Sequence, residues 1–420
     1  MRCASCSPSP ARSRRTGYFH AAAGHPRKPE LLRWARCTAG LSLEDAACRA
    51  KLTPIRRPQE LRLASDPGTP EDAVNKAAVL TAAERLASWE EGRASASLAQ
   101  LKALAKAYRR PLVTFFLAKP PLEAAALTDY RTMADTPRES PEFAALKRRI
   151  YLLHRELCAI AQDEHAHALP LVNSCRMADG VPAVVDAIRR TLHLEPVAEH
   201  RRSSGIDFGS LREQAQDAGI YVVLMGDLGS YRSQVAPDEF RGIAIADEFA
   251  PLVVINSYDT KAAMSFTLAH ELAHIFLGSS GVSNQNAFAP QRRNPSVEQF
   301  CNNVAAELLV PERVLRPAWN PPDGDLSGTV RRLARNFRVS DEVVARRLSD
   351  LRMISEDAYG ELMALYRSRW QRHRERNRNA AGGPNPNTVA RFNLGMKTLG
   401  TLLRAADNRL LTAPTGKPVG

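Results

Sequence analysis

The sequence predicts an α+β protein that is mostly helical and has one small sheet. Helical periodicity recurs along much of the chain, and at 142–164 apolar residues form a single stripe at helical spacing. Strand-like segments rich in β-branched residues lie close together at 219–225, 241–246 and 252–257. An apolar helix, Phe266–Gly278, follows directly. This order predicts a small sheet packed against a central helix.

The composition is that of a globular protein, and its cysteine usage predicts reduced thiols. The 420 residues are enough for two or three domains, and 44% hydrophobic with 25% charged residues is an ordinary balance. Since no apolar run reaches eighteen residues, we expect no membrane partner. Seven cysteines at irregular spacing favour reduced thiols, and therefore a cytoplasmic location. The net charge of +13 raises the question of a nucleic-acid partner.

The chain divides into five predicted regions. The start is rich in Ser, Arg and Pro and lacks the apolar segment of a secretory signal, which indicates a disordered tail or a misassigned start codon. The regions are a disordered basic tail at 1–28, a helical domain at 29–118 with an insert near 53–80, a linker and helical region at 119–205, a central domain at 206–350, and a basic region at 351–420.

Short helices in the first domain resemble the xenobiotic-response-element class of helix-turn-helix. The pair would be Leu43–Ala47, with Ser42 as its N-cap, and Ala83–Trp89. By that resemblance the second helix would enter the major groove of DNA. The candidate DNA contacts are Arg85, Ser88 and Arg93.

The insert interrupts this pattern at the turn. A helix-turn-helix allows three or four residues there, whereas the sequence from Thr53 to Leu80 intervenes and contains four prolines. One interpretation is that the insert loops out while Asp72–Ala78 replaces the second helix. Another is a small helical module that packs on a partner, and the acidic residues Glu84 and Glu90 on the candidate helix favour it.

The central helix carries the motif H-E-x-x-H. His270 and His274 are four residues apart, so a helix presents both imidazoles on one face. Neutral imidazole is a zinc ligand, and the intervening Glu271 is placed to act as a general base toward a water. Gly278 predicts the end of the helix. The pattern predicts a hydrolytic zinc site within the central domain at 206–350.

A second predicted helix, Ser296–Pro311, supplies candidates for the third ligand that a catalytic zinc needs. We predict Glu298 as the ligand and Asn302, one turn later, as a residue that orients a ligand histidine. Glu307 is a competing carboxylate, and Cys301 is a soft donor whose simpler interpretation is a buried thiol. Nitrogen and oxygen ligands accept Mn²⁺ as well as Zn²⁺.

These motifs resemble the ImmA/IrrE family of bacterial metallo-endopeptidases. The similarity covers Phe266–His274, the pair Glu298 and Asn302, residues 305–311 and the strands 241–246 and 252–257. It implies that 206–350 is a zinc peptidase domain with a compact zincin-like fold and a protein substrate. The targets that it implies are repressor-type regulators in a stress, phage or mobile-element response. Tyr258 and Arg241 are weak candidates for a second electrophile.

Three further expectations concern partners. Gly242–Ala246 is a candidate edge strand for an extended substrate, the alternative being an ordinary sheet strand. The basic, Trp-containing segment Arg367–Arg378 is a candidate nucleic-acid contact or a solvated helix. His154, His165 and His167 are expected to be solvated. The alternative function is a DNA-binding transcriptional regulator with a structural or vestigial metal site.

Overall fold

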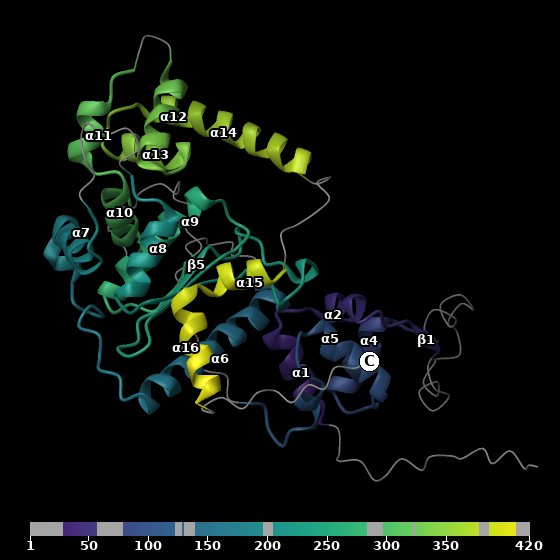
Figure 1. The fold of residues 1–420 in the computed structure, drawn as a ribbon. Coiled ribbons are helices and arrows are strands. Elements are labelled where there is room, and N and C mark those ends of the chain that lie inside the picture. The colour runs from purple at the N-terminus through teal and green to yellow at the C-terminus, as the bar shows by residue number, and fades with distance from the viewer. Residues whose placement is uncertain are drawn as a thin grey trace, which may run out of the picture. The chain divides into compact units, whose positions relative to one another are not determined.

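The computed structural model describes residues 28–56, 79–121, 128–129, 139–195, 205–283, 297–321, 325–377 and 386–408 (Figure 1). The chain forms two compact units, one of residues 1–38 and 42–121 and the other of residues 39–41 and 122–420. The described residues from 128 onward, which span the regions predicted at 119–205, 206–350 and 351–420, therefore belong to one unit, whereas residues 119–121 belong to the first. Mostly helical structure with a small five-stranded mixed sheet agrees with the predicted α+β class. None of the described helices combines the length and apolarity needed to cross a membrane.

The first unit is a small helical domain. Ser42 caps α2 by accepting a hydrogen bond from the Asp45 amide, as predicted. Between α2 and α4, the strands β1 and β2 pair antiparallel, with Ile55 opposite Leu80, so the insert opens from a short two-stranded stem. Asp72–Ala78, the predicted replacement helix, lies outside the described residues. The elements are α1 (Pro29–Thr38), α2 (Leu43–Arg49), β1 (Ile55–Arg56), β2 (Val79–Leu80), α4 (Ala82–Glu90), α5 (Leu98–Ala107) and the 3₁₀ helix η2 (Leu112–Phe116).

A five-stranded sheet forms the centre of the second unit, in the order β3-β7-β5-β6-β4. β5 runs antiparallel to both of its neighbours, β6 and β7, while β4 runs parallel to β6. Of the two alternatives for Gly242–Ala246, the edge strand is therefore wrong and the ordinary sheet strand is confirmed, because β6 and β7 pair with β5 on its two sides. The strands are β3 (Thr128–Asp129), β4 (Tyr221–Leu224), β5 (Gly242–Ile245), β6 (Leu252–Ile255) and β7 (Gly281–Ser283).

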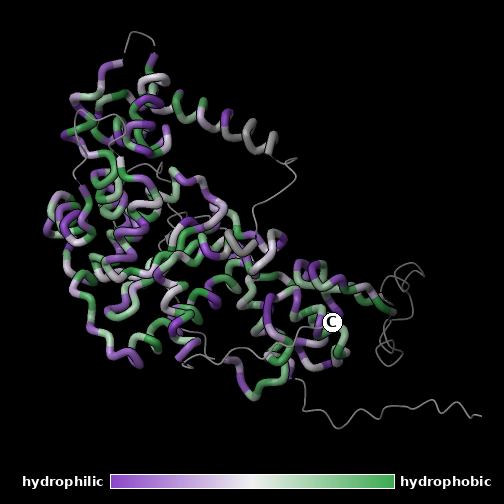
Figure 2. The backbone as a smooth tube through the Cα atoms, viewed as in Figure 1, coloured by the Kyte–Doolittle hydropathy of each residue, from purple (hydrophilic) through white to green (hydrophobic). Residues whose placement is uncertain are grey.

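Helices cover both faces of this sheet. Because side chains alternate along a strand, Ala244 of β5 packs into the core with α8, α9 and α10, while Ile243 and Ile245 pack into the core with α6. Hydrophobic stretches of this unit gather along the strands and the helices packed on them (Figure 2). The helices are α6 (Pro141–Asp163), α7 (Gly180–Thr191), α8 (Phe208–Asp217), α9 (Lys261–Phe276) and α10 (Val297–Leu309), with the 3₁₀ turns η3 (Met177–Asp179) and η4 (Tyr231–Ser233).

The C-terminal helices extend the same unit. α15 and α16 contact β4, at one edge of the sheet, and α16 runs beside α6 (Figure 1). The buried Arg212 of α8 donates to the carbonyls of Phe392 and Asn393 and so ties α15 to the core. Side chains in most of the basic segment Arg367–Arg378 lie outside the described part. The elements are α11 (Glu312–Ala318), α12 (Leu326–Phe337), α13 (Asp341–Asp350), α14 (Glu356–Asn377), α15 (Pro386–Leu394) and α16 (Met396–Asp407).

Candidate metal centre

α9 is the helix that carries the H-E-x-x-H motif, and it is buried on nearly every side from Met264 to Phe276. Its N-cap, Thr260, accepts a hydrogen bond from the Ala263 amide. The helix ends at Phe276, and Gly278 follows with φ +66°, a left-handed conformation that suits glycine. A helix that is apolar all round has no solvent face, so its two histidines and its glutamate lie in the protein interior.

His270, His274 and Glu298 converge on one point. The Nε2 atoms of the two histidines are 3.0 Å apart. The Glu298 carboxylate reaches both rings, at 3.2 Å from Nε2 of His270 and 3.1 Å from Nε2 of His274. Each of the three residues is only 2% exposed. Two neutral or cationic rings and one carboxylate thus share a space from which water is almost excluded.

This donor set fits a divalent metal ion. Ligand atoms about 2.0–2.1 Å from zinc at tetrahedral angles lie about 3.3 Å from each other, close to the three distances found here. Burial raises the pKa of Glu298, but hydrogen bonds and charge from the two histidines outweigh it and hold that pKa at about 2. Glu298 is therefore an anionic oxygen donor at neutral pH. Two imidazoles and one carboxylate leave a fourth position for solvent or substrate.

Asn302 orients one of the histidines. It lies one helical turn after Glu298 on α10, and its Oδ1 is 3.0 Å from Nδ1 of His270. An amide oxygen only accepts, so this contact assigns the proton to Nδ1 and leaves the Nε2 lone pair directed at the cluster. The orienting function predicted for Asn302 matches this geometry.

Glu271 directly follows His270 on α9, and its carboxylate lies against the backbone of β5. Glu271 is fully buried. Gly242 lies directly against it: a β-carbon at that position would overlap the Glu271 carboxylate and would lie 2.7 Å from Cγ2 of Thr267. The strand therefore approaches α9 as closely as it does because residue 242 has no side chain. Gly242 was not among the predicted site residues, although a glycine at the start of an apolar strand is a known signal of close backbone approach.

The two competing candidates, Glu307 and Cys301, are not among the side chains that converge with His270 and His274. Glu307 pairs with Arg347 and accepts a hydrogen bond from the Glu312 amide. Cys301 is fully buried, and burial together with the charges of Glu298 and Glu271 raises the pKa of its thiol well above the usual value. This residue is therefore a neutral core thiol, as its simpler interpretation held.

The two weak candidates for a second electrophile are engaged in other contacts. Tyr258 donates from its hydroxyl to Asp227 at 2.5 Å, and Arg241 forms an ion pair with Asp259 at 3.3 Å. Burial and Asp227 raise the pKa of Tyr258, so its hydroxyl stays protonated. Neither contact directs these side chains to the His-His-Glu cluster.

The candidate DNA contacts in the first unit have mixed surroundings. Ser88 is buried and donates to the Arg85 carbonyl, so its hydroxyl cannot face DNA in this conformation, and the prediction for Ser88 is wrong. Arg85 donates to the Thr53 carbonyl and lies over the Trp89 ring. Arg93 is exposed and pairs with Glu91. Only the two arginines keep charge that a phosphate could contact.

Comparison with known proteins finds a similarity in the central part of the chain. Residues 215–349 match the family Peptidase_M78, described as an IrrE N-terminal-like domain. The matched segment runs from α8 to α13 and contains β5, α9 and α10 with the whole His-His-Glu cluster. The match agrees with the resemblance to the ImmA/IrrE family and indicates a metallopeptidase-like domain. A search of the curated proteins found no match.

Proposed function

We propose that this protein is a zinc-dependent endopeptidase that cleaves a repressor-type regulator. The observation that carries the proposal is the buried convergence of His270, His274 and Glu298 beside the carboxylate of Glu271. A structural site would need the three ligands but would have no use for a second buried carboxylate, that of Glu271, directly after His270. The Peptidase_M78 match over the same residues supports a peptidase.

Each residue has a distinct role in this proposal. His270, His274 and Glu298 hold the ion, and Asn302 fixes the ring of His270. A bound divalent ion supplies Lewis-acid polarisation of a peptide carbonyl and lowers the pKa of a water molecule. Glu271 takes the proton of the attacking water and passes it to the leaving amine. Its confinement beneath Gly242 limits the rotamers that the carboxylate can adopt.

The ion that we propose is zinc. Two imidazoles and one carboxylate are a common catalytic zinc set, whereas Mn²⁺ favours sites with more oxygen donors. Elemental analysis of the purified wild type beside His270→Ala tests this identity. We expect zinc in the wild type and its loss from this site in the variant. Manganese bound preferentially to the wild type would contradict the choice of ion but not the site.

The substrate class rests on the resemblance to ImmA/IrrE peptidases. We propose a repressor of stress, phage or mobile-element genes, and candidates are the regulators encoded beside this gene. The test is incubation of each purified candidate with the wild type and with Glu271→Gln, followed by mass spectrometry of the products. We expect cleavage at a defined bond by the wild type and none by the variant. Equal cleavage by both proteins would exclude the proposed role of Glu271.

A second candidate function is DNA binding by the first unit. The observation in its favour is that α2 and α4 pack together although the insert separates them in sequence, because the β1–β2 stem brings the ends of the insert together. Binding through phosphates weakens steeply with salt, so titration of DNA affinity against salt is the test. The absence of binding even at low salt would exclude this function and leave the peptidase proposal intact.

A further inference from the structure

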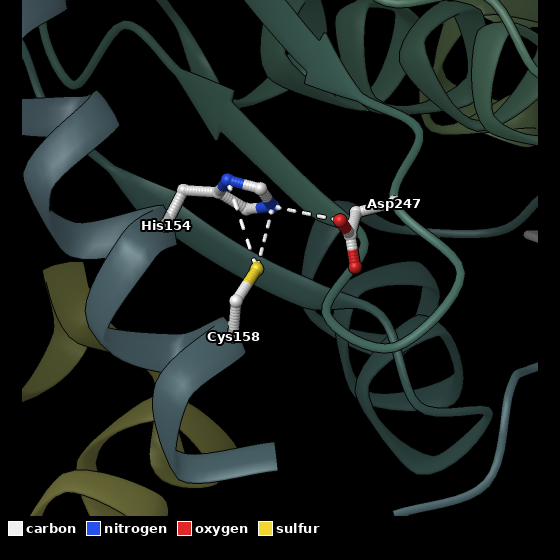
Figure 3. A group of neighbouring side chains, drawn as sticks. All are labelled: His154, Cys158 and Asp247. Carbon is white, nitrogen blue, oxygen red and sulfur yellow. Dashed lines mark hydrogen bonds and ion pairs between the residues drawn. The ribbon is translucent and has the colours of Figure 1, made fainter. Parts of the chain in front are cut away.

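A second group of metal-binding side chains lies on α6. His154 and Cys158 are four residues apart on this helix, and Asp247, which follows β5, completes the group (Figure 3). Sγ of Cys158 is 3.4 Å from Nε2 of His154, which is 3.9 Å from Oδ2 of Asp247. The donor atoms of all three residues lie within 4.8 Å of one another. The expectation that His154 is solvated is wrong, since its side chain is only 12% exposed, whereas His165 and His167 are exposed as expected.

The surrounding backbone orients the acid of this group. Oδ1 of Asp247 accepts hydrogen bonds from the amides of Phe249 and Ala250, both at 2.9 Å, which turns Oδ2 toward His154. His154 and Cys158 are held on the same face of α6 by their spacing of four residues. The turn after β5 therefore holds the carboxylate toward the other two side chains before any ion binds.

This group is separate from the His-His-Glu cluster. Gly242, at the start of β5, faces α9 and Glu271, whereas Ile243 and Ile245 face α6 on the other side of the sheet. Asp247 follows the opposite end of the strand, five residues from Gly242, which corresponds to about 16 Å along an extended chain. A side chain of one site thus cannot serve as a ligand in the other.

A cysteine nucleophile is the main alternative for these three residue types. In such a triad the acid holds one ring nitrogen and the thiol faces the other. Here Nε2 of His154 is the nearer ring nitrogen to Cys158 and also the atom that faces Asp247. Convergence of all three donors on one space instead favours a shared cation.

We propose that His154, Cys158 and Asp247 bind a second divalent ion of the zinc class, which fastens α6 to the turn between β5 and β6. Sulfur, nitrogen and oxygen donors together suit zinc, and tetrahedral coordination would place them about 3.4–3.6 Å apart. Binding displaces the Cys158 thiol proton to solvent and forms bonds from Sγ, Nε2 and Oδ2 to the ion. The thiolate and the carboxylate balance the two positive charges. Solvent reaches the site, because the Asp247 side chain is 32% exposed.

Cobalt substitution tests the site directly, because a cobalt–thiolate bond gives a charge-transfer absorption that nitrogen and oxygen ligands do not. The full-length protein, stripped of metal, is titrated with Co²⁺ alone. We expect two equivalents and a thiolate band in the wild type. Cys158→Ser should lose the band and one equivalent, while His270→Ala should lose one equivalent and keep the band. A wild type without the band, or a Cys158→Ser variant that retains it, would overturn the proposal.

Two controls keep this outcome specific. The double variant Cys3→Ser/Cys6→Ser removes the other closely spaced thiols and should keep the band. Asp247→Asn preserves an oxygen that can accept from Phe249 and Ala250 but removes the charge, so we expect Co²⁺ to bind at least tenfold more weakly. Loss of the band in the double variant would assign it to Cys3 and Cys6 and overturn the proposal. Unchanged affinity in Asp247→Asn would remove Asp247 from the ligand set.

Thermal unfolding tests the fastening function without any peptidase readout. An ion that binds the folded chain preferentially raises its unfolding temperature. We expect Zn²⁺ to raise the unfolding temperature of His270→Ala, which lacks the first site, and to have no such effect on His270→Ala/Cys158→Ser. Equal shifts in the two variants would mean that the ion acts elsewhere. The comparison also separates this proposal from the peptidase proposal, because neither variant needs to cleave a substrate.

Discussion

Two helices of this protein, α9 and α6, each present a pair of metal-binding side chains four residues apart, and each pair is completed by a carboxylate from a distant segment. On α9 the pair is His270 and His274, completed by Glu298. On α6 it is His154 and Cys158, completed by Asp247. In both places the spacing of four residues puts two donor side chains on the same face of a helix, independently of the tertiary fold.

The two groups differ in what surrounds them. The α9 group is nearly inaccessible, with ligands 2% exposed, and it has Glu271 as an additional buried carboxylate. The α6 group is partly open, and the other oxygen of its acid is held by the backbone of a turn. A catalytic centre needs a proton acceptor beside the ion, and in the function that we propose Glu271 of the α9 group is that acceptor. Helical spacing alone thus provides the geometry of a metal site, whereas the residues around the site determine its chemistry.

The largest effect is expected from Glu271→Gln. A general base contributes about 10²–10⁴-fold to rate, so peptidase activity on the identified substrate should fall by at least about a hundredfold. Metal content should not change, because Glu271 is not among the ligands. Glu156→Gln, on the exposed face of α6, is the matched control and should leave activity unchanged. Loss of metal from Glu271→Gln would mean that this carboxylate is a ligand, and the α9 group would then have no additional carboxylate to distinguish it from the α6 group.

Gly242→Ala should affect the α9 group through packing. The added methyl group meets the Glu271 carboxylate and Thr267, and overpacking of this kind costs about 1–3 kcal/mol in unfolding free energy. Activity should fall as well, because the proton acceptor must move. Gly360→Ala is the control: nothing lies within 4 Å of its added carbon, and alanine should stabilise α14 by about 0.5–1 kcal/mol. Urea unfolding measures both variants, and equal stability of the two would show that β5 can move away from α9.

Asn302→Ala should weaken metal binding at the α9 group alone. Residues that orient a ligand histidine contribute about 10–100-fold to metal affinity, and Asn302 holds Nδ1 of His270. Competition with a chelator measures this affinity. The neighbouring Asn303 accepts a hydrogen bond from the side-chain amide of Gln299. Asn303→Ala is therefore a matched control that should bind metal normally. The cobalt–thiolate band proposed for Cys158 should be the same in both variants, and a parallel loss there would mean that the two groups are coupled.

Local patterns in the sequence predict much of the fold. The predicted helix at 142–164 is α6, Pro141–Asp163, because its apolar stripe and its ends are encoded locally. The motif helix begins at Lys261 rather than at Phe266, since its cap, Thr260, lies in a polar segment with no apolar periodicity. The interior position of β5 could not be predicted. It depends on pairing with β7, a three-residue strand that no local pattern distinguishes from a loop.

The same limit applies to the two metal-binding groups. H-E-x-x-H places two ligands and a base within five residues, and Glu298 follows on the next helix, so the α9 group can be predicted from sequence. The α6 group has a mixed His and Cys pair, and its acid lies 247 − 158 = 89 residues later. Only the packing of α6 on the sheet brings Asp247 to it. A histidine and a cysteine on a helix are usually separate surface or core residues, so the sequence alone favours no site there.

The smallest predicted difference concerns the caps of the two helices. The Thr260 hydroxyl of α9 accepts a hydrogen bond from the Ala263 amide, whereas the Ser140 hydroxyl of α6 accepts from the Phe143 amide and also donates to Glu239. Loss of an N-cap costs about 0.5–2 kcal/mol, and we expect Thr260→Ala near the lower end and Ser140→Ala near the upper end, because Glu239 then loses one of its two bonds to residue 140. Urea unfolding of both variants checks the order. The reverse order would mean that the N-cap contributes more to the stability of α9 than to that of α6. The burial of α9 in the core would then stabilise this helix less than its packing indicates.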